Sequence, residues 1–506
     1  MDILLSLPSL FKGVWNNPLL LGIFLAIFVF TFDYMKRRKC WSRYPPGPVS
    51  LPFIGTILQI DYHNPHVSFT QLSKKYGNIY SLQNFWTNVV VLNGFKAVKE
   101  ALVNKSEDFA DRPFFPAYRH LGYGEYNQGL VMAQYGQVWK EQRRFTLCIL
   151  RDFGMGKKSL AQLVTEEAGY LCSVFSSNEG QSFDPHYLIN NAVSNVICFL
   201  TFGTRFDYED QKFQSLLHLL EQSMQEEAGL LPQVLNSLPF LTHIPGIMPK
   251  VFRHQKEFMD YIAEIVNAHK ETWYPSSKQN ITEAFLEEIE KKKDENSCFN
   301  YQNLTLMIGD LFAAGTETTT TTLRWGLLYM ILYPDVQSKV QEEIDAVIGR
   351  NRSVSLEDQE NMPYTRAVIH EIQRFGDIVP AGIPHKTYRD TEVEGFFIPK
   401  GTTIMTNLSS VLKDEAMWEN PHRFWPEHFL DANGQFVKRE AFIPFSAGRR
   451  ICLGEQLAKM ELFLFFTSLL QHFTFHIAED HPKPREDGCF AFTLVPHPYY
   501  IKAVSR

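Results

Sequence analysis

The chain has 506 residues, 45% hydrophobic and 14% aromatic, so it can bury a large core and is neither disordered nor fibrous. Its formal net charge of −7 comes with no polybasic tail or basic stripe, which argues against nucleic acid as a partner. The seven cysteines have no paired CxxC spacing, which argues against a disulfide framework and against a zinc site.

The first forty residues predict an N-terminal membrane anchor. Residues 13–32 carry no charge, and about 20 apolar residues are enough to span a bilayer. The basic cluster at residues 36–39 follows directly and is expected to stay cytosolic, which leaves the short N-terminus on the other side. The alternative is a secretory signal peptide, but no small-residue cleavage site intervenes.

The anchor, residues 1–40, is followed by a proline-rich hinge at residues 41–50 and a catalytic domain at residues 51–506. Residues 79–82 and 89–92 are strand-like, and residues 393–408 hold another pair of strand candidates. Helical periodicity dominates residues 96–375, as in the segment that opens at Pro334 and stops at Gly349. The fold class is therefore mainly α with a small β subdomain.

Residues 230–252 are unusual because four prolines interrupt a run rich in leucine, isoleucine, phenylalanine and methionine. The segment is either a loop that faces the core or one that dips into the membrane beside the anchor, since an exposed apolar patch needs a partner.

The stretch FSAGRRICLG at residues 445–454 leads into a long apolar helix at residues 456–472 and contains Cys452. A thiolate that binds a metal needs hydrogen-bond donors and positive potential, which backbone amides at a helix start supply. Gly448 and Gly454 would let the backbone pass close to a flat bound group, where a Cβ atom would collide. An isolated cysteine would more simply be a buried thiol, but the spacing of five fixed positions favours a ligand.

This stretch resembles the FxxGxRxCxG haem loop of the cytochrome P450 superfamily, and the resemblance extends over essentially the whole chain. The wording of the motifs is most similar to the vertebrate microsomal family two, subfamily D, whose members hydroxylate basic drugs. The resemblance implies the cytochrome P450 fold behind one transmembrane helix, and haem b with Cys452 as the axial ligand of its iron. It implies further haem contacts from Arg112, Trp139, Arg143, His385, Phe445, Gly448, Arg450 and Gly454.

Two further motifs resemble a structural network of the family. Glu371 and Arg374 are similar to the ExxR pair, two opposite charges one helical turn apart that brace the haem side of the core. Glu427 and His428 lie in a stretch similar to the loop that completes this network. His428 stands where many relatives have arginine, so we expect a weaker charge network.

The stretch AGTET at residues 314–318, inside a helical run at residues 304–332, resembles the (A/G)GxxT element above the iron. Ala314 and Gly315 would give an oxygen ligand room. Glu317 beside Thr318 suits a water-mediated proton relay, and both are predicted to be catalytic. The alternative for Thr318 is a hydroxyl that bonds back to its own helix.

In the same resemblance, Asp310 and Glu227 match a pair of acids that attract a cationic amine. The predicted pocket walls are Val131, Ala314, Phe490 and Phe492, and Val131 stands where the best-known relative has phenylalanine. Asp310, Ala314 and Thr318 follow at i, i+4 and i+8, so they share one helix stripe. The competing interpretation is that Asp310 accepts backbone hydrogen bonds from the loop near residues 123–128 and acts as a brace.

The chain contains no glycine-rich nucleotide loop and no flavin-like domain, so electrons must come from a partner. The resemblance implies NADPH as their source, NADPH-cytochrome reductase as the carrier and cytochrome b5 as a possible helper. It also implies the endoplasmic reticulum membrane, with the N-terminus lumenal and the catalytic domain cytosolic. The docking face would carry Lys140, Arg143, Arg144 and Arg449.

Three other functions stay open. They are hydroxylation or epoxidation of neutral lipids such as fatty acids or steroids, a haem-thiolate isomerase or dehydratase, and a non-catalytic haem sensor. Reductase-dependent turnover would separate the last two from a monooxygenase.

Overall fold

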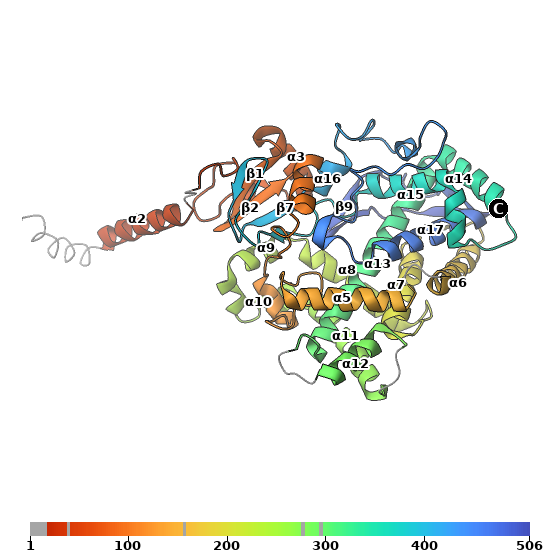
Figure 1. Cartoon of the computed structure of the whole chain (residues 1–506), viewed down its shortest axis with the longest axis horizontal. Coiled ribbons are helices and arrows are strands. Elements are labelled where there is room, and N and C mark those ends of the chain that lie inside the picture. Colours follow the sequence, from red (N-terminus) through yellow and green to blue (C-terminus); the bar gives the residue numbers. More distant parts are fainter. Residues whose placement is uncertain (1–17, 38–40, 155–157, 275–278, 293–296) are drawn as a thin grey trace, which may run out of the picture.

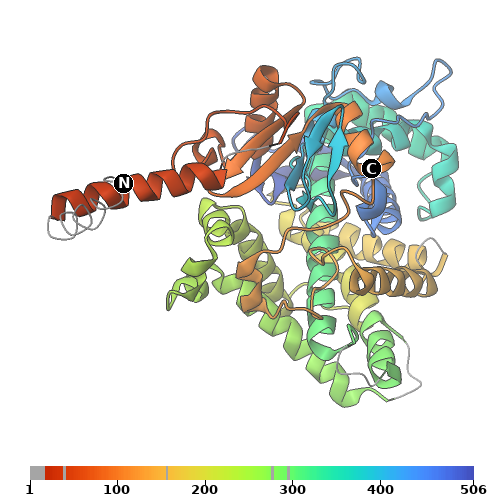
Figure 2. The same ribbon diagram turned by 60° about the vertical axis from the view of Figure 1, so that its left-hand side comes forward.

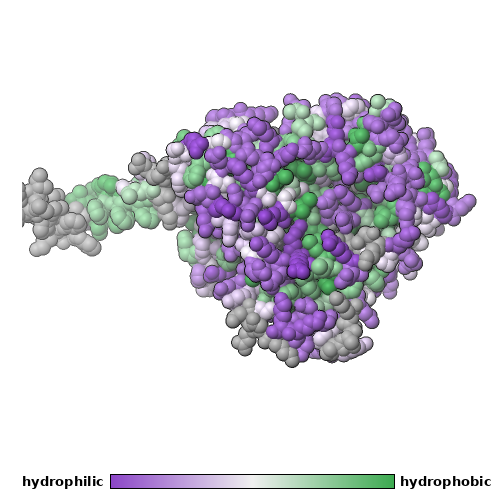
Figure 3. All heavy atoms as spheres, viewed as in Figure 1, coloured by the Kyte–Doolittle hydropathy of each residue, from purple (hydrophilic) through white to green (hydrophobic). Residues whose placement is uncertain are grey.

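The uncharged run near the N-terminus forms helix α2 (Pro18–Arg37), which projects from the rest of the molecule (Figure 1). The computed structural model describes residues 18–37, 41–154, 158–274, 279–292 and 297–506, so the first part of the predicted span lies outside it. Within these residues, α2 is the one helix long and apolar enough to cross a membrane, with a mean hydropathy of 2.0 over residues 18–35. Its exposed apolar side chains form a hydrophobic surface outside the body (Figure 3).

One side chain ties α2 to the body. Asp33 is only 1% exposed, and its Oδ1 accepts hydrogen bonds from the Phe53 amide at 3.2 Å and the Trp86 indole at 3.1 Å. Phe30, one turn earlier, packs against Phe53 with ring centroids 5.5 Å apart. The last turns of α2 are therefore held against the catalytic body by contacts as well as by the covalent link.

Helices dominate the body, as their apolar periodicity predicted (Figures 1 and 2). In its first half they are α3 (Pro65–Tyr76), α4 (Gly94–Lys99), α5 (Gln137–Asp152), α6 (Lys158–Ser176), α7 (His186–Phe202), α8 (Gln211–Glu227), α9 (Leu230–Ser237) and α10 (Ile247–Val251). They continue with α11 (Arg253–Thr272), α12 (Ile281–Lys292), α13 (Tyr301–Leu332), α14 (Pro334–Val347), α15 (Pro363–Gly376), α16 (Leu408–Leu412) and α17 (Glu455–His472). The predicted helices at residues 304–332, 334–348 and 456–472 correspond closely to α13, α14 and α17.

Helix α13 runs through the middle of the body (Figure 2) and spans about 48 Å at 1.5 Å per residue. The Asn300 side chain caps it by accepting a hydrogen bond from the Asn303 amide. Its C-terminal half is buried almost all round, so its side chains there serve as core. Gly326 in this half allows close packing, because a Cβ atom there would lie 3.3 Å from Ile372.

The predicted strands form a small sheet of order β1-β2-β7-β4. Strands β1 (Ile79–Asn84) and β2 (Thr87–Leu92) are an antiparallel hairpin, β7 (Thr403–Thr406) is parallel to β2, and β4 (His385–Lys386) closes the edge. The remaining strands pair as β5 (Thr391–Val393) with β6 (Phe396–Ile398), β9 (Gly488–Ala491) with β10 (Thr493–Pro496), and β11 (Ile501–Ser505) with β3 (Ser182–Phe183) and β8 (Phe473–Ile477). The β content is small, as expected.

The proline-interrupted segment at residues 230–252 forms α9, the 3₁₀ turn η4 (Pro239–His243) and α10. Leu235, Met248 and Phe252 are buried together against Ala117. Other apolar side chains of the segment point outward: Leu230, Leu231, Phe240 and Ile244 are exposed. The segment is thus partly core-facing and partly an apolar surface, and it lies at the end of the body from which α2 projects (Figures 1 and 2).

Glu371 and Arg374 form a fully buried ion pair on α15. Arg374 donates from Nε and Nη2 to the two carboxylate oxygens of Glu371 at 2.7 Å each. Its other donors reach the carbonyls of Leu412, Pro421 and Arg423, so all five guanidinium hydrogens are used. The pair therefore joins α15 to the chain segment that leads towards the Cys452 loop.

We expected His428 to weaken the charge network, but its side chain takes part in the network through both ring nitrogens. Its Nδ1 lies 3.2 and 3.3 Å from the two Glu371 oxygens, while its Nε2 accepts the Asn420 amide hydrogen at 3.2 Å. The imidazole therefore bridges Glu371 to the Asn420 backbone, with Nδ1 as its donor. The prediction was wrong for Glu427, whose carboxylate points outward and lies 4.0 Å from the Lys339 ammonium, because the donors of Arg374 are already taken by other acceptors.

Removing one partner of this pair should destabilise the fold strongly. We expect Arg374→Ala to lower the free energy of unfolding by about 3–5 kcal/mol, because Glu371 would remain as an uncompensated buried charge. Denaturant unfolding followed by circular dichroism would measure the loss. The control is Arg253→Ala, which breaks an exposed ion pair with Glu257 and should leave the midpoint unchanged. Equal effects of the two substitutions would contradict the assignment.

Candidate active site

Cys452 lies at the end of a tight loop that begins at Phe445. The Cys452 amide donates to the Phe445 carbonyl at 3.0 Å, and the turn passes through positive φ angles at Ser446 and Gly448. Burial raises the pKa of the Cys452 thiol, while the amides of Gly454 and Glu455 at the start of α17 oppose that rise. The side chain is nevertheless solvent-accessible.

The two glycines of the loop have different reasons to be there. A Cβ atom on Gly448 would lie 1.7 Å from the Leu102 carbonyl oxygen, so this glycine is required by packing within the protein and not by a flat bound group. That corrects the expectation for Gly448. A Cβ atom on Gly454 would meet only the Cys452 sulfur, at 4.0 Å, so the protein itself leaves space beside it.

Three arginines gather beside Cys452. Arg112 donates to the carbonyls of Val131, Ile383 and Pro384, and Arg450 donates to those of Ala110 and Ala133 at 2.6 Å. Arg143 donates to the Ile451 carbonyl at 2.7 Å, next to the cysteine. The loop before α5, helix α5 itself and the loop before α17 thus deliver guanidinium groups to one place.

Their charge is not balanced within the protein. Burial, together with the mutual repulsion of the arginines, lowers the pKa of Arg112 to about 9 and that of Arg450 to about 8. Burial also lowers the pKa of Arg143. Asp111 is the one carboxylate that opposes these shifts for Arg112 and Arg450. Two buried cations and one half-buried cation against one carboxylate would suit a ligand with two negative groups.

Trp139 and His385 belong to the same site. The Arg450 guanidinium lies 4.0 Å above the Trp139 ring and that of Arg143 lies 5.6 Å from it, so the indole supports both cations. Burial, and then the charge of Arg112, hold the pKa of His385 well below its usual range. Its Nδ1 donates to the Phe109 carbonyl, so Nε2 can donate to a carboxylate only when the ring is doubly protonated, a state that an added anion favours.

These residues fit the haem that the sequence predicted. The thiol of Cys452 would be the axial ligand, Arg112, Arg143 and Arg450 would bind the two propionates, and Gly454 would face the macrocycle. Phe445 lies half-buried at the edge of the loop, with the Lys459 ammonium 5.6 Å from its ring. The surplus of buried positive charge is the observation that supports this fit.

Helix α13 carries the residues predicted to lie above the iron. Ala314 is exposed although it lies in the middle of a helix within the body, so its side chain has free space beside it. Gly315 does not, because a Cβ atom there would lie 2.5 Å from Ile197 on α7. The expectation that Gly315 makes room for oxygen was wrong, since one residue along a helix turns the side chain by about 100°.

Glu317 and Thr318 do not bond to each other. The Thr318 hydroxyl donates to the Ala314 carbonyl at 2.7 Å, which is the back-bonding alternative. The Glu317 carboxylate accepts hydrogen bonds from Thr321 at 3.1 Å and from Thr493 at 2.8 Å. Sequence reasoning missed Thr493, because a bond between α13 and a hairpin 176 residues later leaves no local pattern.

Asp310 lies two turns before Thr318 on α13 and is engaged by the backbone of a loop. Its Oδ2 accepts the amide hydrogens of Leu130 at 2.6 Å and Val131 at 2.9 Å, and Oδ1 lies 3.5 Å from the Tyr123 hydroxyl. A Cβ atom on Gly129 would lie 2.6 Å from this carboxylate. The brace interpretation therefore describes its contacts, although the backbone donors, Leu130 and Val131, follow residues 123–128.

Glu227 lies close enough to Asp310 for their charges to interact. It accepts a hydrogen bond from Tyr118 at 2.9 Å and a short one from Gln255. Burial raises the pKa of Asp310 to about 6, and burial and the Asp310 charge raise that of Glu227. Neither carboxylate has an ion-pair partner in the part of the chain that the structure describes. Tyr118 and Tyr123 line this acidic pair, and the sequence analysis missed both as site residues. No local sequence pattern indicates them, because each bonds to a residue far along the chain.

The predicted pocket walls differ in exposure. Phe490, on β9, is half-buried with its ring 6.3 Å from that of His66, whereas Phe492 at the hairpin tip is 37% exposed. Val131 connects two parts of the site, since its amide donates to Asp310 and its carbonyl accepts from Arg112 at 3.3 Å.

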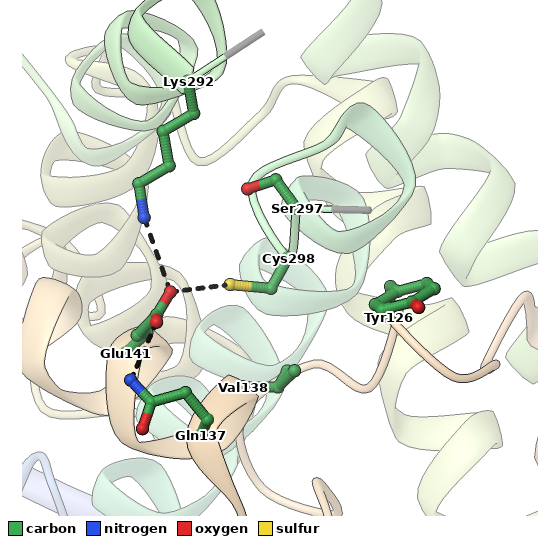
Figure 4. A pocket seen from close by; sticks show the side chains of 7 residues that line it. All are labelled: Tyr126, Gln137, Val138, Glu141, Lys292, Ser297 and Cys298. Carbon is green, nitrogen blue, oxygen red and sulfur yellow. Dashed lines mark hydrogen bonds and ion pairs between the residues drawn. The ribbon is translucent and has the colours of Figure 1, made fainter. Parts of the chain in front are cut away.

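Figure 4 shows a separate hollow of about 380 Å³ between α5 and the segment before α13. The Cys298 sulfur lies 3.6 Å from the Glu141 carboxylate, which also pairs with Lys292 at 3.4 Å. Burial and the Glu141 charge raise the pKa of the Cys298 thiol, so it is not an activated nucleophile. None of the predicted haem or substrate residues lines this hollow, whose walls are Tyr126, Gln137, Val138, Glu141, Lys292, Ser297 and Cys298.

Comparisons with known proteins show the family of this chain. The family model of cytochrome P450 matches residues 45–503. Cytochrome P450 2D6 of Homo sapiens is 56% identical over 489 residues, which cover 96% of this chain and 98% of that protein. Cytochrome P450 2D14 of Bos taurus is 56% identical over 501 residues, 98% and 100% of the two chains, and cytochrome P450 2D3 of Rattus norvegicus is 54% identical over 497 residues, 98% and 99%. The chain therefore belongs to the cytochrome P450 family of monooxygenases, within which it is similar to the 2D proteins.

Proposed function

We propose that this monooxygenase inserts one oxygen atom of O₂ into lipophilic basic amines, with haem b as its cofactor and electrons that come from NADPH through a reductase. The observation that carries the substrate class is the buried acidic pair, Asp310 and Glu227, which has no cation of its own among the described residues. A ligand ammonium would supply the missing charge. Asp310 and Thr318 are separated by about 12 Å of helix rise, which suits a substrate with its amine at one end and its oxidised carbon at the other.

The energy available from such a contact is moderate. An ammonium about 4 Å from a carboxylate gains on the order of 4 kcal/mol at an effective dielectric constant near 20, and desolvation offsets much of it. The backbone hydrogen bonds to Asp310 do not compete with this role, because they occupy mainly Oδ2. They hold the carboxylate in place, so the binding of an amine costs less conformational entropy of the Asp310 side chain.

In the proposed reaction, bound haem supplies the iron at which dioxygen is bound and cleaved, and a thiolate ligand favours that cleavage. Cys452 would hold the iron, and Ala314 would leave space for the bound oxygen. Because the Thr318 hydroxyl hydrogen is directed at the Ala314 carbonyl, its oxygen can accept a hydrogen bond from a water. Glu317 delivers protons through water after it rotates away from Thr321 and Thr493.

The proposed electron donor docks on the Cys452 side of the molecule. Lys140, Arg144 and Arg449 are exposed there, whereas Arg143 is turned inward to the Ile451 carbonyl. An acidic surface of NADPH-cytochrome reductase, or of cytochrome b5, would complement the three exposed cations.

The proposed location is the endoplasmic reticulum membrane, with the N-terminus lumenal and the catalytic domain cytosolic. Lys36 and Arg37 end α2 on the side of the body, which supports this orientation by the positive-inside rule. The exposed side chains of Leu230, Leu231, Phe240 and Ile244 supply a second apolar surface near α2, and we propose that it enters the same bilayer.

A second candidate function is hydroxylation of neutral lipids, and the backbone contacts of Asp310 are the observation that favours it. If the carboxylate acts only as a brace, ligand charge has no influence on binding. An isomerase or a haem sensor would have no use for Glu317 beside Thr318, and reductase-dependent turnover separates both from a monooxygenase.

The ligation of the iron is tested by replacing Cys452. We expect Cys452→His and Cys452→Ala to abolish the red-shifted Soret band of the reduced carbonyl complex, because that band requires a thiolate opposite the carbon monoxide. Absorption spectra of the purified variants measure this. Survival of the band in either variant would disprove the assignment, and Cys148→Ser, at an exposed cysteine outside the site, is the control.

The substrate class is tested with a cationic amine and its neutral isostere. We expect Asp310→Asn to weaken the amine by about ten- to hundredfold, or about 1.5–3 kcal/mol, and the neutral isostere hardly at all. Glu227→Gln should weaken the amine in the same direction. Spectral titration of the haem gives both dissociation constants. Equal losses for the two ligands would rule out recognition of charge and leave the brace.

The pH dependence follows from the raised pKa of Asp310, which is about 6 in the free protein. Above about pH 7 the carboxylate is ionised and the affinity for a strongly basic amine is constant. Below pH 6 it is protonated, so the affinity should fall by up to about tenfold per pH unit. Titrations between pH 5 and 8 measure this. The Asp310→Asn variant should lose most of this dependence, and a flat profile in the unmodified protein would contradict the prediction.

A further inference from the structure

A thiol, an imidazole and a carboxylate lie together on the outer side of the β9–β10 hairpin, away from the haem site. The Cys489 sulfur lies 3.3 Å from Nδ1 and 3.7 Å from Nε2 of His497. The Asp487 carboxylate lies 3.8 Å from Nε2 of the same imidazole. Because side chains alternate along a strand, Cys489 faces outward where its neighbour Phe490 is half-buried.

The surrounding charges favour one arrangement of protons. Hydrogen bonding to Arg485 lowers the pKa of Asp487, so this carboxylate is ionised. An anion on the Nε2 side favours the tautomer with its hydrogen on Nε2, which leaves Nδ1 as a base towards the thiol. Nucleophile, base and orienting carboxylate are then in the order that activates a cysteine.

The other described cysteines lack this arrangement. Cys172 and Cys198 are buried, and burial raises the pKa of both thiols to about 12 or above. Cys298 is held near Glu141, and Cys452 belongs to the haem site. Cys148 is exposed like Cys489, but no imidazole lies within hydrogen-bond distance of it in the part of the chain that the structure describes.

We propose that Cys489 is a site of oxidation by hydrogen peroxide, with His497 as the base that accepts the thiol proton. The sulfur attacks one peroxide oxygen, an S–O bond forms and the O–O bond breaks. Sulfur is oxidised by two electrons to the sulfenic acid, and the peroxide is reduced. The proton on His497 passes to the leaving hydroxide, which departs as water, so atoms and electrons balance.

The test uses the haem-loaded full-length protein in phospholipid vesicles. Hydrogen peroxide is added with dimedone, a cyclic diketone that captures sulfenic acids, and mass spectrometry follows the adduct at Cys489 and Cys148 over time. We expect Cys489 to be labelled about tenfold faster than Cys148. His497→Gln should reduce labelling of Cys489 to the rate of Cys148 without changing the rate at Cys148 itself.

Cys148 serves as a control within each molecule, because a change in its rate would report altered folding or altered peroxide. Cys489→Ser should remove the adduct from the hairpin and leave the Soret band of the reduced carbonyl complex unchanged. Equal labelling of the two cysteines in the unmodified protein would overturn the proposal. So would unchanged labelling of Cys489 in the His497→Gln variant.

Discussion

Three guanidinium groups lie beside one thiol, those of Arg112 and Arg450 buried and that of Arg143 half-buried, and the effective cost of burying an unpaired cation is several kcal/mol. An anionic ligand at this site would offset that cost. The loop before α5, the Cys452 loop and the strand at His385 are all bonded through these arginines, so haem binding and the joining of distant segments depend on the same charges.

The Glu371 network shows how another buried charge is handled without a ligand. Every donor of Arg374 has an acceptor, and Glu371 also accepts from the Trp425 amide and faces His428. The His428 imidazole contacts both Glu371 and the Asn420 amide. A bulkier cation at this position would have to make different contacts. The Glu371 network is complete within the protein and stabilises it. The arginine cluster beside Cys452 lacks balancing charge within the protein, as a site for an anionic ligand would.

Much of this could be predicted from the sequence, because the features were local. The anchor, helices α13, α14 and α17, the hairpin β1–β2 and the position of Cys452 follow from runs and spacings within a few turns. The directions of Gly315 and Glu427 were missed, since helix packing and competition for the donors of Arg374 depend on neighbours far along the chain. The same holds for the Thr493 bond to Glu317 and for the loop amides that engage Asp310.

The hydrogen bonds that Asp33 accepts from Phe53 and Trp86 also set the direction in which α2 leaves the body, and with it the way the body would meet a membrane surface. Helix α2 has 20 residues and is about 30 Å long, which equals the thickness of the hydrocarbon layer. Because its last turns are bonded to the body, the orientation of the helix is coupled to that of the catalytic domain. In the proposed orientation, a thinner or thicker bilayer would rotate the whole domain and change the depth at which lipophilic molecules meet its surface.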